Sequence, residues 1–295
     1  MIAAKVLLIG ASGQLGQALW KSVPAKIELF ALTRRECDLC DKSRLELIIK
    51  TLNPDLIVNC AAYTNVDMAE SEAESAFRLN AQALSHLAEI ARCQGARLVT
   101  FSTDYVFDGN SKKAYTPESE PSPINVYGAS KLEGERLAAD ILGDSLLIIR
   151  TAWLYSPWGT NFVKTILRLL NESNEIKVVN DQYGSPTWAT SLAHTTWQLI
   201  KHNSSGIYHF ADGGVASWYE FACAIRDEAL EHKLVVDPAE IISVSSLEAG
   251  RPARRPAWSV LDSNKAIAVS SLEPLAWQVC LGRFFADEFK RYACI

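Results

Sequence analysis

The chain has 295 residues, of which 48% are hydrophobic and 21% charged, enough for one large domain or two lobes around a substantial core. Its formal net charge of −5 gives no basic surface of the kind that binds nucleic acid. No run of about 18 apolar residues could span a bilayer, and no secretory signal precedes the first predicted strand. We therefore expect a cytoplasmic protein with no nucleic-acid or membrane partner.

The cysteines do not indicate a disulfide framework or a metal site. Seven are scattered along the chain, an odd number, as expected for reduced thiols in a cytosolic protein. Cys37 and Cys40 form a C-x-x-C pair, but no second pair or suitably spaced histidine completes a zinc site. We expect no bound metal.

The first predicted elements are typical of the start of a dinucleotide-binding fold. Residues 5–9 predict a buried strand, and a helical pattern follows as far as Trp20. Between them, Gly10, Gly13 and Gly16 allow a tight turn and a close approach of the backbone to a pyrophosphate at the helix N-terminus. Their spacing is G-x-x-G-x-x-G rather than G-x-G-x-x-G, so a plain strand-helix turn is the alternative interpretation.

The second predicted strand, residues 27–32, bears on the choice of cofactor. An acidic residue near this strand end would bind the ribose hydroxyls of adenosine, but here the strand ends in Thr33-Arg34-Arg35. Arginines suit a ribose 2′-phosphate through bidentate charged hydrogen bonds, so the sequence predicts a preference for NADPH over NADH. A solvated basic turn is the alternative. Asp38 either caps the turn or lies near the adenine.

The next two predicted strands end in residues suited to a ligand site. The third, from Leu56, ends in small residues, Ala61 and Ala62, which leave room for a cofactor at the carboxyl edge of a sheet. A long helix is expected to open at the acidic stretch from Asp67. The fourth strand, from Arg97, ends at Ser102-Thr103, where a hydroxyl could donate to a substrate carbonyl.

Tyr127 and Lys131 are four residues apart, so on the predicted helix that ends near Ile141 they lie on one face, one turn apart. A nearby ammonium favours the phenolate and lowers the pKa of a tyrosine. Tyr127 is therefore a candidate proton donor and acceptor near neutral pH. The alternative is an amphipathic helix with an exposed lysine. A fifth strand is predicted from Leu146 to Arg150.

The pattern changes after Thr151, where aromatic and amide residues become frequent. We expect helices ending near Leu170, over residues 188–202 and from Ser217 to Glu231, the last with a capping box to Glu220, and a closing helix from Phe284 to Tyr292. Residues 1–150 are interpreted as an NAD(P)-binding Rossmann domain. Residues 151–295 are interpreted mainly as a substrate-binding lobe, with later segments returning to the first domain.

Four features resemble the extended short-chain dehydrogenase/reductase family in their order and spacing. They are the glycine turn, the small residues after the third strand, the hydroxyls after the fourth, and Tyr127 with Lys131. Further resembling segments are Val58-Asn59 to Tyr63-Thr64, Ser102 to Phe107, Asn125 to Gly128, Asn180 to Gly184, and Arg255-Pro256 with Ser259 and Leu261. The resemblance implies an α/β fold: a Rossmann-type doubly wound parallel sheet with a smaller C-terminal α/β lobe.

Within that family, the resemblance is to members that reduce a nucleotide-linked 6-deoxy sugar. It implies that NADPH, with NADH as the alternative cofactor, gives a hydride to the C4 ketone of dTDP-4-dehydro-L-rhamnose, forming dTDP-L-rhamnose. Tyr127 would protonate the ketone oxygen, and Thr103 would hydrogen-bond it. Lys131 would lower the tyrosine pKa and bind the nicotinamide ribose.

The resemblance also implies two sets of ligand contacts. Residues expected at the cofactor are Gly10, Ser12, Gly13, Gln14, Leu15, Arg34, Asp38, Leu39, Ala61, Ala62, Tyr63, Tyr127 and Lys131. Those expected at the substrate are Thr103, Asp104, Val106, Trp153, Gln182 and Arg255. Trp153 would pack on the sugar and Arg255 would bind the diphosphate, since its fork-shaped cation suits that group. The alternative for Arg255 is capping a loop.

Two departures limit what the resemblance implies. The basic Arg34-Arg35 end of the second strand differs from members with an acidic residue nearby, which weakens any transfer of dual cofactor use. Some members dimerise through a magnesium site built from glutamates, but the equivalent positions here are Ala18 and Thr190, which supply no carboxylate. We expect a monomer or weak homodimer. Two other functions remain open: a non-catalytic, cofactor-binding subunit like the β subunit of methionine adenosyltransferase, and a reductase or epimerase-reductase of another nucleotide sugar.

Overall fold

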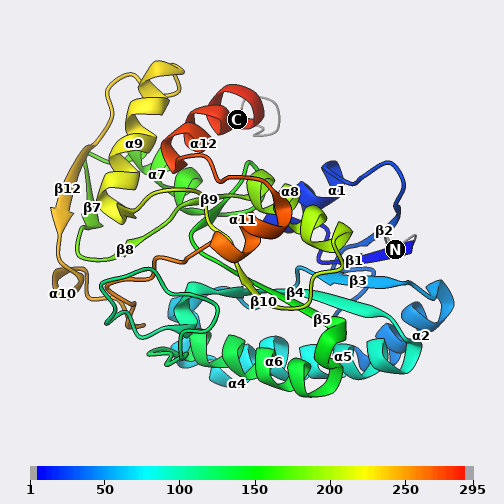
Figure 1. Cartoon of the computed structure of the whole chain (residues 1–295). Helices are drawn as coiled ribbons and strands as arrows, with labels where there is room; N and C mark the ends of the chain where they lie inside the picture. Colours follow the sequence, from blue (N-terminus) through cyan, green and yellow to red (C-terminus); the bar gives the residue numbers. More distant parts are fainter. Residues whose placement is uncertain (1–4, 290–295) are drawn as a thin grey trace.

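The computed structural model describes residues 5–289 and is built on one six-stranded parallel sheet (Figure 1). The strand order is β10-β5-β4-β3-β1-β2, and every neighbouring pair is parallel. The strands are β1 (Lys5–Ile9), β2 (Glu28–Leu32), β3 (Leu56–Asn59), β4 (Arg97–Thr103), β5 (Leu146–Thr151) and β10 (Gly206–His209). The expected Rossmann-type α/β fold is confirmed.

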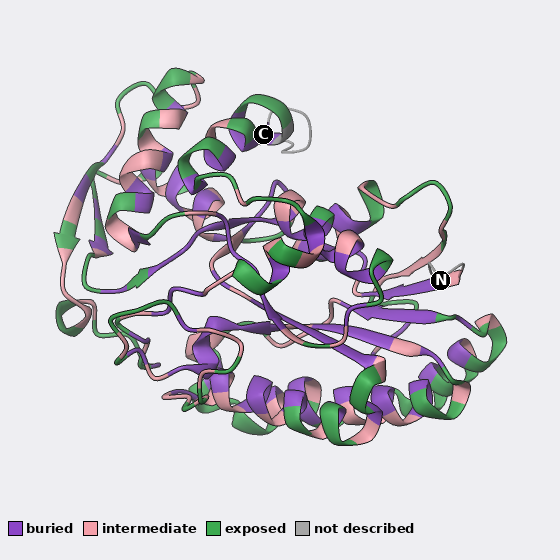
Figure 2. Ribbon diagram, in the orientation of Figure 1, coloured by how far each residue is buried: buried purple, intermediate pink, exposed green. Residues whose placement is uncertain are grey.

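Helices cover both faces of this sheet. On β1, Val6 and Leu8 belong to one apolar cluster and Leu7 and Ile9 to another, because successive side chains of a strand point to opposite faces. One layer consists of α2 (Lys42–Leu52), α5 (Ala83–Gln94) and α6 (Val126–Leu142), and the other of α1 (Gln14–Lys21), α8 (Ala189–Lys201) and α11 (Asn264–Ser270). Figure 2 shows the buried strands between these layers.

The single long helix expected from Asp67 is interrupted in the structure. It consists of α3 (Val66–Ser71), α4 (Ala73–Phe77), a π-helical turn (Arg78–Gln82) and α5, with a break at Glu72. The π turn places the Asn80 amide against the Tyr63 main chain, from which it accepts at 2.9 Å and to which it donates at 3.0 Å. Asn80 also donates to Ser130 Oγ on α6 at 2.9 Å. A nonlocal contact thus overrides the local helical pattern.

The smaller lobe has its own apolar core. Helices α7 (Phe162–Glu172) and α9 (Trp218–Glu231) pack against the parallel pair β7 (Glu175–Val179) and β12 (Glu240–Val244), which the sequence analysis did not predict. The predicted capping box of Ser217 and Glu220 is confirmed. The remaining elements are the pairs β6 (Leu154–Tyr155) with β9 (Thr187–Trp188) and β8 (Tyr183–Gly184) with β11 (Ala216–Ser217), the helices α10 (Ser246–Ala249) and α12 (Trp277–Arg283), and the 3-10 turns at Asp104–Val106 and Gly143–Ser145.

The closing helix expected at Phe284–Tyr292 differs from the structure. A π-helical turn at Phe284–Phe289 continues α12, and residues 290–292 lie outside the described residues. No helix among the described residues combines the length and apolarity of a membrane span.

A buried ion pair joins α6 to β5 of the sheet. Glu135 on α6 accepts from Arg150 on β5 at 2.6 Å (Nη2) and 3.0 Å (Nε), and both side chains are almost completely buried. His209 on β10 lies at 2.9 Å from the Tyr115 carbonyl through Nδ1 and 3.5 Å from Arg150 Nη1 through Nε2. The carbonyl can only accept, so Nδ1 carries the hydrogen. Burial, aided by Arg150, lowers the pKa of His209 to about 3, so the imidazole is neutral.

Candidate active site

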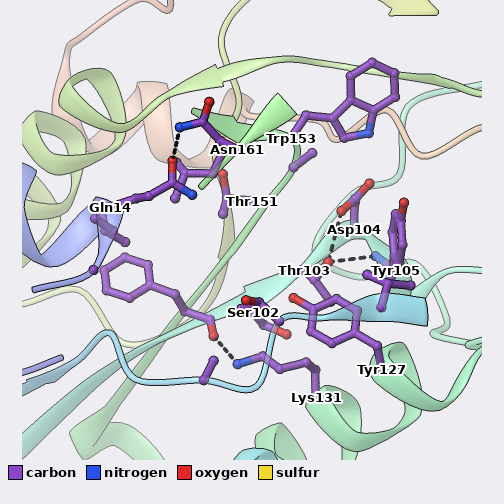
Figure 3. A pocket seen from close by; sticks show the side chains of 18 of the residues that line it. Gln14, Ser102, Thr103, Asp104, Tyr105, Tyr127, Lys131, Thr151, Trp153 and Asn161 are labelled. Atoms are coloured by element: carbon purple, nitrogen blue, oxygen red, sulfur yellow. Dashed lines mark hydrogen bonds between the residues drawn. The ribbon is translucent and has the colours of Figure 1, made fainter. Parts of the chain in front are cut away.

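A cavity of about 620 Å³ lies where β1, β4 and β5 end and α6 begins (Figure 3). This is the carboxyl edge of the sheet, where ligands bind in open α/β folds. Of the predicted site residues it is lined by Gly13, Gln14, Leu15, Ala62, Thr103, Asp104, Tyr127, Lys131 and Trp153. Residues from five segments of the chain are therefore brought together as the sequence analysis expected.

A second cavity, of about 200 Å³, adjoins the first along the glycine turn. It is lined by the predicted cofactor residues Gly10, Ser12, Gly13, Arg34, Asp38, Leu39, Ala61 and Ala62. Gly13, Cys60 and Ala62 line both cavities, so the two form one groove. Gly10 has a φ of +79°, and a Cβ there would lie 2.8 Å from the Ala61 nitrogen, so only glycine permits this approach of the two loops.

The start of α6 fixes the position of Tyr127. Asn125 caps the helix by accepting from the Gly128 nitrogen at 2.7 Å, and its amide donates to the Arg254 carbonyl at 2.9 Å. A Cβ on Gly128 would overlap the Tyr105 carbonyl oxygen. The Tyr127 ring packs edge-on against Tyr105 with centroids 5.9 Å apart. The start of the helix and the Tyr105 ring therefore position the Tyr127 side chain together.

The expectation that Lys131 lowers the pKa of Tyr127 is wrong for this structure. Burial raises the pKa of Tyr127 to about 12, and a hydrogen bond with Thr103 offsets only part of that rise. The Lys131 ammonium donates to the Phe101 carbonyl at 2.7 Å. Burial lowers the pKa of Lys131 itself to about 8. Tyr127 thus holds its proton near neutral pH, which suits a proton donor.

Several polar atoms that line the central cavity make no hydrogen bond within residues 5–289. They are Ser102 Oγ, Asp104 Oδ2 and Thr151 Oγ1, each buried. Buried polar groups are normally paired, so these atoms are suited to a polar ligand. Asp104 is 2% exposed, and burial raises the pKa of its carboxyl to about 7. Sequence analysis included Asp104 but missed Thr151 and treated Ser102 only as an alternative to Thr103.

Trp153 lies on the far wall of the cavity and is stacked on Trp218. The ring centroids are 3.5 Å apart and the planes are 8° from parallel. Trp153 has a φ of +48°, uncommon for a bulky residue and a frequent feature of ligand sites. Trp218 lines the same cavity and was missed, because it lies 65 residues later at the start of α9.

Gln14 connects the glycine turn to the smaller lobe. Its side-chain oxygen accepts from Ser156 Oγ at 3.1 Å and from Asn161 Nδ2 at 2.9 Å. Asn161 in turn caps α7 by accepting from the Lys164 nitrogen. Gln14 therefore holds the wall of the cavity together as well as lining it.

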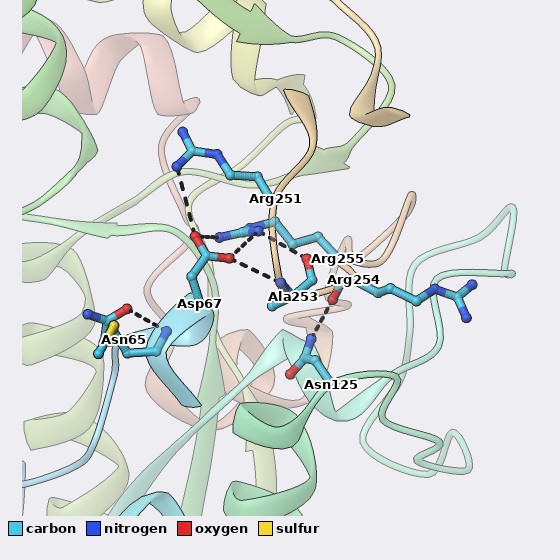
Figure 4. A network of polar contacts seen from close by, with 8 residues as sticks. Asn65, Asp67, Asn125, Arg251, Ala253, Arg254 and Arg255 are labelled. Carbon is cyan, nitrogen blue, oxygen red and sulfur yellow. Dashed lines mark hydrogen bonds and ion pairs between the residues drawn. The ribbon is translucent and has the colours of Figure 1, made fainter. Parts of the chain in front are cut away.

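A third cavity, of about 360 Å³, shares Val66, Tyr105 and Trp218 with the central one. Its lining includes Lys177, Gln182, Arg251 and Arg255. Arg255 donates to both carboxylate oxygens of Asp67 at 3.0 and 2.9 Å and to the Ala253 carbonyl at 3.2 Å (Figure 4). The loop-holding alternative for Arg255 is thus present. Arg251, which sequence analysis missed, is 65% exposed at its side chain and lies 3.9 Å from Asp67.

Two predicted site residues do not line these cavities. The Val106 side chain is fully buried with Phe107 and Leu261, so it could meet a ligand only through its main chain. Tyr63 donates its hydroxyl to Glu72 at 2.8 Å. In the part of the chain that the structure describes, no group of three His, Cys, Asp or Glu side chains is placed to hold a metal ion.

The groove fits a nicotinamide dinucleotide. Glycine at position 10 lets the turn lie against the Ala61 loop, and both line the second cavity, while the unpaired hydroxyls of Ser102 and Thr151 line the adjoining central cavity. Arg34 lines the second cavity with its side chain 83% exposed and pairs with Asp38 at 3.3 Å. A cation at this point suits a ribose 2′-phosphate.

Comparison with known proteins yields consistent matches over nearly the whole chain. The family model described as RmlD substrate binding domain matches residues 4–289. The dTDP-4-dehydrorhamnose reductase of Aggregatibacter actinomycetemcomitans is 38% identical over 286 residues, covering 94% of this chain and 97% of that protein. The dTDP-4-keto-6-deoxy-D-glucose reductase of Streptomyces niveus is 36% identical over 288 residues, covering 96% of this chain and 98% of that protein.

A solved structure agrees with these sequence matches. The crystal structure of dTDP-4-dehydrorhamnose reductase from Bacillus anthracis in complex with NADP has a TM-score of 0.91 and 36% identity to this chain. The match covers 96% of this chain and 99% of that one. The smaller lobe and the sheet thus have a common arrangement in the two proteins.

Proposed function

Because the chain belongs to the RmlD substrate binding domain family, we propose that it is an NADPH-dependent reductase of the C4 ketone of dTDP-4-dehydro-L-rhamnose, giving dTDP-L-rhamnose. The observation that carries the proposal is the position of Thr103, Tyr127 and Lys131 in one cavity, between the glycine-turn groove and the arginine-lined third cavity. This order suits a dinucleotide on one side and a nucleotide sugar on the other.

Each site residue has its own role in the reduction. When bound, NADPH supplies the hydride that reduces the ketone carbon. Tyr127 is protonated at neutral pH because burial raises its pKa, and it donates that proton to the oxygen at C4. Thr103 lines the same cavity as Tyr127 and hydrogen-bonds that oxygen. Lys131 lines the same cavity one helical turn from Tyr127, and we assign it to binding the nicotinamide ribose.

The nucleotide end of the substrate is assigned to the third cavity. Arg251 is the more accessible cation for the diphosphate, and Arg255 is oriented beside it by Asp67. Trp153 and its stacked neighbour Trp218 form an aromatic wall that suits a sugar face. Gln182 lines the third cavity, where its Nε2 donates to Ser246 Oγ at 2.7 Å.

The proposal also covers the setting in which the enzyme acts. We place it in the cytoplasm. We also propose that it is a monomer or weak homodimer, because Ala18 and Thr190 offer no carboxylate for a shared magnesium ion. Light scattering with and without Mg²⁺ tests this. A dimer that forms only with the metal would contradict it.

The deciding assay follows the loss of NADPH absorbance with enzymatically made dTDP-4-dehydro-L-rhamnose. Wild-type protein should consume NADPH, and Tyr127→Phe should lower kcat by about 10² to 10⁴, the usual contribution of a general acid. Tyr183→Phe is the matched control, since Tyr183 is exposed and lines none of the three cavities.

The outcomes separate the alternatives. Binding of NADPH without consumption would favour the non-catalytic cofactor-binding subunit. Consumption with dTDP-4-keto-6-deoxy-D-glucose but not with the rhamnose precursor would favour the activity for which the Streptomyces niveus relative is named.

A further inference from the structure

The hydroxyl of Thr103 has more partners than its single proton can serve. It donates to Asp104 Oδ1 at 3.0 Å and accepts from the Tyr105 nitrogen at 3.2 Å. It also hydrogen-bonds the Tyr127 phenol. A threonine hydroxyl has one donor and two acceptor positions. While Asp104 is ionised and takes the proton, Thr103 has nothing left to donate to a ketone oxygen.

The surroundings of Asp104 disfavour its ionised form. This residue is 2% exposed and lines the central cavity, and Oδ2 has no hydrogen-bond partner within the described residues. The Ser259 hydroxyl lies within reach of the Asp104 carboxyl and lowers its pKa by hydrogen bonding, but it also lies 3.4 Å from the Tyr183 carbonyl, to which it can donate instead. Burial of this carboxylate outweighs the hydrogen bonds that favour its ionised form, from Ser259, Thr103 and the main chain, whereas the neutral acid has one proton to give.

We propose that Asp104 is a positioning acid for the reduction: its protonated carboxyl donates through Oδ1 to Thr103 Oγ1, and this turns the Thr103 proton toward the substrate oxygen at C4. Ionisation of Asp104 reverses that hydrogen bond and withdraws the proton from the substrate. The inference rests on the proposed function, and it adds to it a reason why the residue after Thr103 is an acid.

Burial supports the protonated form near neutral pH, since it raises the pKa of Asp104 to about 7. The other titratable groups around it are Tyr105 on the same turn, Tyr127 and Lys131 on α6, and Arg255, which reaches Tyr105 rather than Asp104. Burial raises the pKa of both tyrosines well above neutrality. Lys131, with a pKa of about 8, is the other group that titrates near the working range.

The test measures single-turnover reduction between about pH 5 and about pH 9, a range that brackets both groups. Single turnover prevents product release from masking the chemical step. In wild type, the rate should fall above about pH 7 by about tenfold per pH unit. Asp104→Asn, whose amide donates at every pH, should lose this limb and fall only where Lys131 titrates, whatever its absolute rate.

A double-mutant comparison separates positioning from a structural role. In a Thr103→Val background, Asp104→Asn should leave the pH profile unchanged, because Asp104 acts through the missing hydroxyl. An Asp104→Asn protein that keeps the wild-type alkaline limb would overturn the inference. So would a shift of the profile by the same amount with and without Thr103.

A measurement without substrate keeps this inference distinguishable from the proposed function. Infrared difference spectra of wild type against Asp104→Asn should contain the stretch of a protonated carboxyl at neutral pH, lost as pH rises. Failure of wild type to consume NADPH would refute the proposed function. An Asp104 that is ionised from about pH 5 upward would refute the inference, with or without turnover.

Discussion

Replacing Glu135 by Gln removes one charge from the buried pair with Arg150 while keeping the size of the side chain. Both partners are within 4% of complete burial, so the Arg150 guanidinium would be left charged and uncompensated inside the protein. Its remaining neighbours are a neutral His209 and the ring of Phe107 at 5.3 Å. Breaking a buried pair in this way costs about 3 to 5 kcal/mol.

The chain offers a matched control. Glu172 and Arg168 on α7 are also 2.6 Å apart, but their side chains are more than half exposed. An exposed pair at this helical spacing contributes only about 0.3 to 0.5 kcal/mol. Glu172→Gln should therefore change the free energy of unfolding far less than Glu135→Gln, although the broken contact has the same length.

Urea unfolding followed by circular dichroism gives both free energies. A second variant, Glu135→Leu with Arg150→Met, removes both charges and should recover most of the loss, because no unpaired charge remains. If Glu135→Gln lowers the free energy of unfolding no more than Glu172→Gln does, burial does not increase the contribution of the Glu135–Arg150 pair to stability. The reasoning would then be refuted.

Two further predictions concern the cofactor and pH. Arg34→Ala should lower kcat/KM for NADPH by about tenfold or more, the loss of one charged hydrogen bond, and leave kcat/KM for NADH unchanged. Arg35→Ala, outside the cavity, is its control, and an equal loss with both cofactors would contradict a phosphate contact. The pKa of His209 is lowered in the folded protein to about 3. Between that value and about pH 6.5, the unfolded chain therefore binds a proton at this imidazole and the folded chain does not. Wild type should lose stability as pH falls from about 6.5 toward that value. In urea unfolding measured across this pH range, His209→Asn should lose less stability than wild type. An equal dependence of the unfolding free energy on pH in the two proteins would exclude His209 as the cause.

The local features of the fold could be predicted from the residues. Apolar runs at β1 and β3 specify buried parallel strands, and the Gly10 turn specifies a close approach of two loops. The four-residue spacing of Tyr127 and Lys131 holds on α6. These features depend on residues near one another in the chain, where helical and strand periodicity decide which side chains share a face.

The chemistry of the candidate site depends on contacts that no local pattern contains. The break at Glu72 accompanies a π turn in which Asn80 bonds Tyr63 and Ser130, and the Trp153–Trp218 stack joins segments that are 65 residues apart in the chain. The Asp67–Arg255 pair spans 188 positions. Such pairs form only when distant segments of the chain have packed together.

Sequence by itself therefore determined the strands of the sheet, the glycine turn and the placement of Tyr127 and Lys131 one turn apart on the same helix. Only the tertiary structure decided the protonation states, because a pKa follows burial and hydrogen-bond partners rather than residue spacing. Lys131 is directed to the Phe101 carbonyl, Tyr127 keeps its proton, and Asp104 is left with an unpaired oxygen. Each follows from how much water and how many donors the packed chain leaves at that atom.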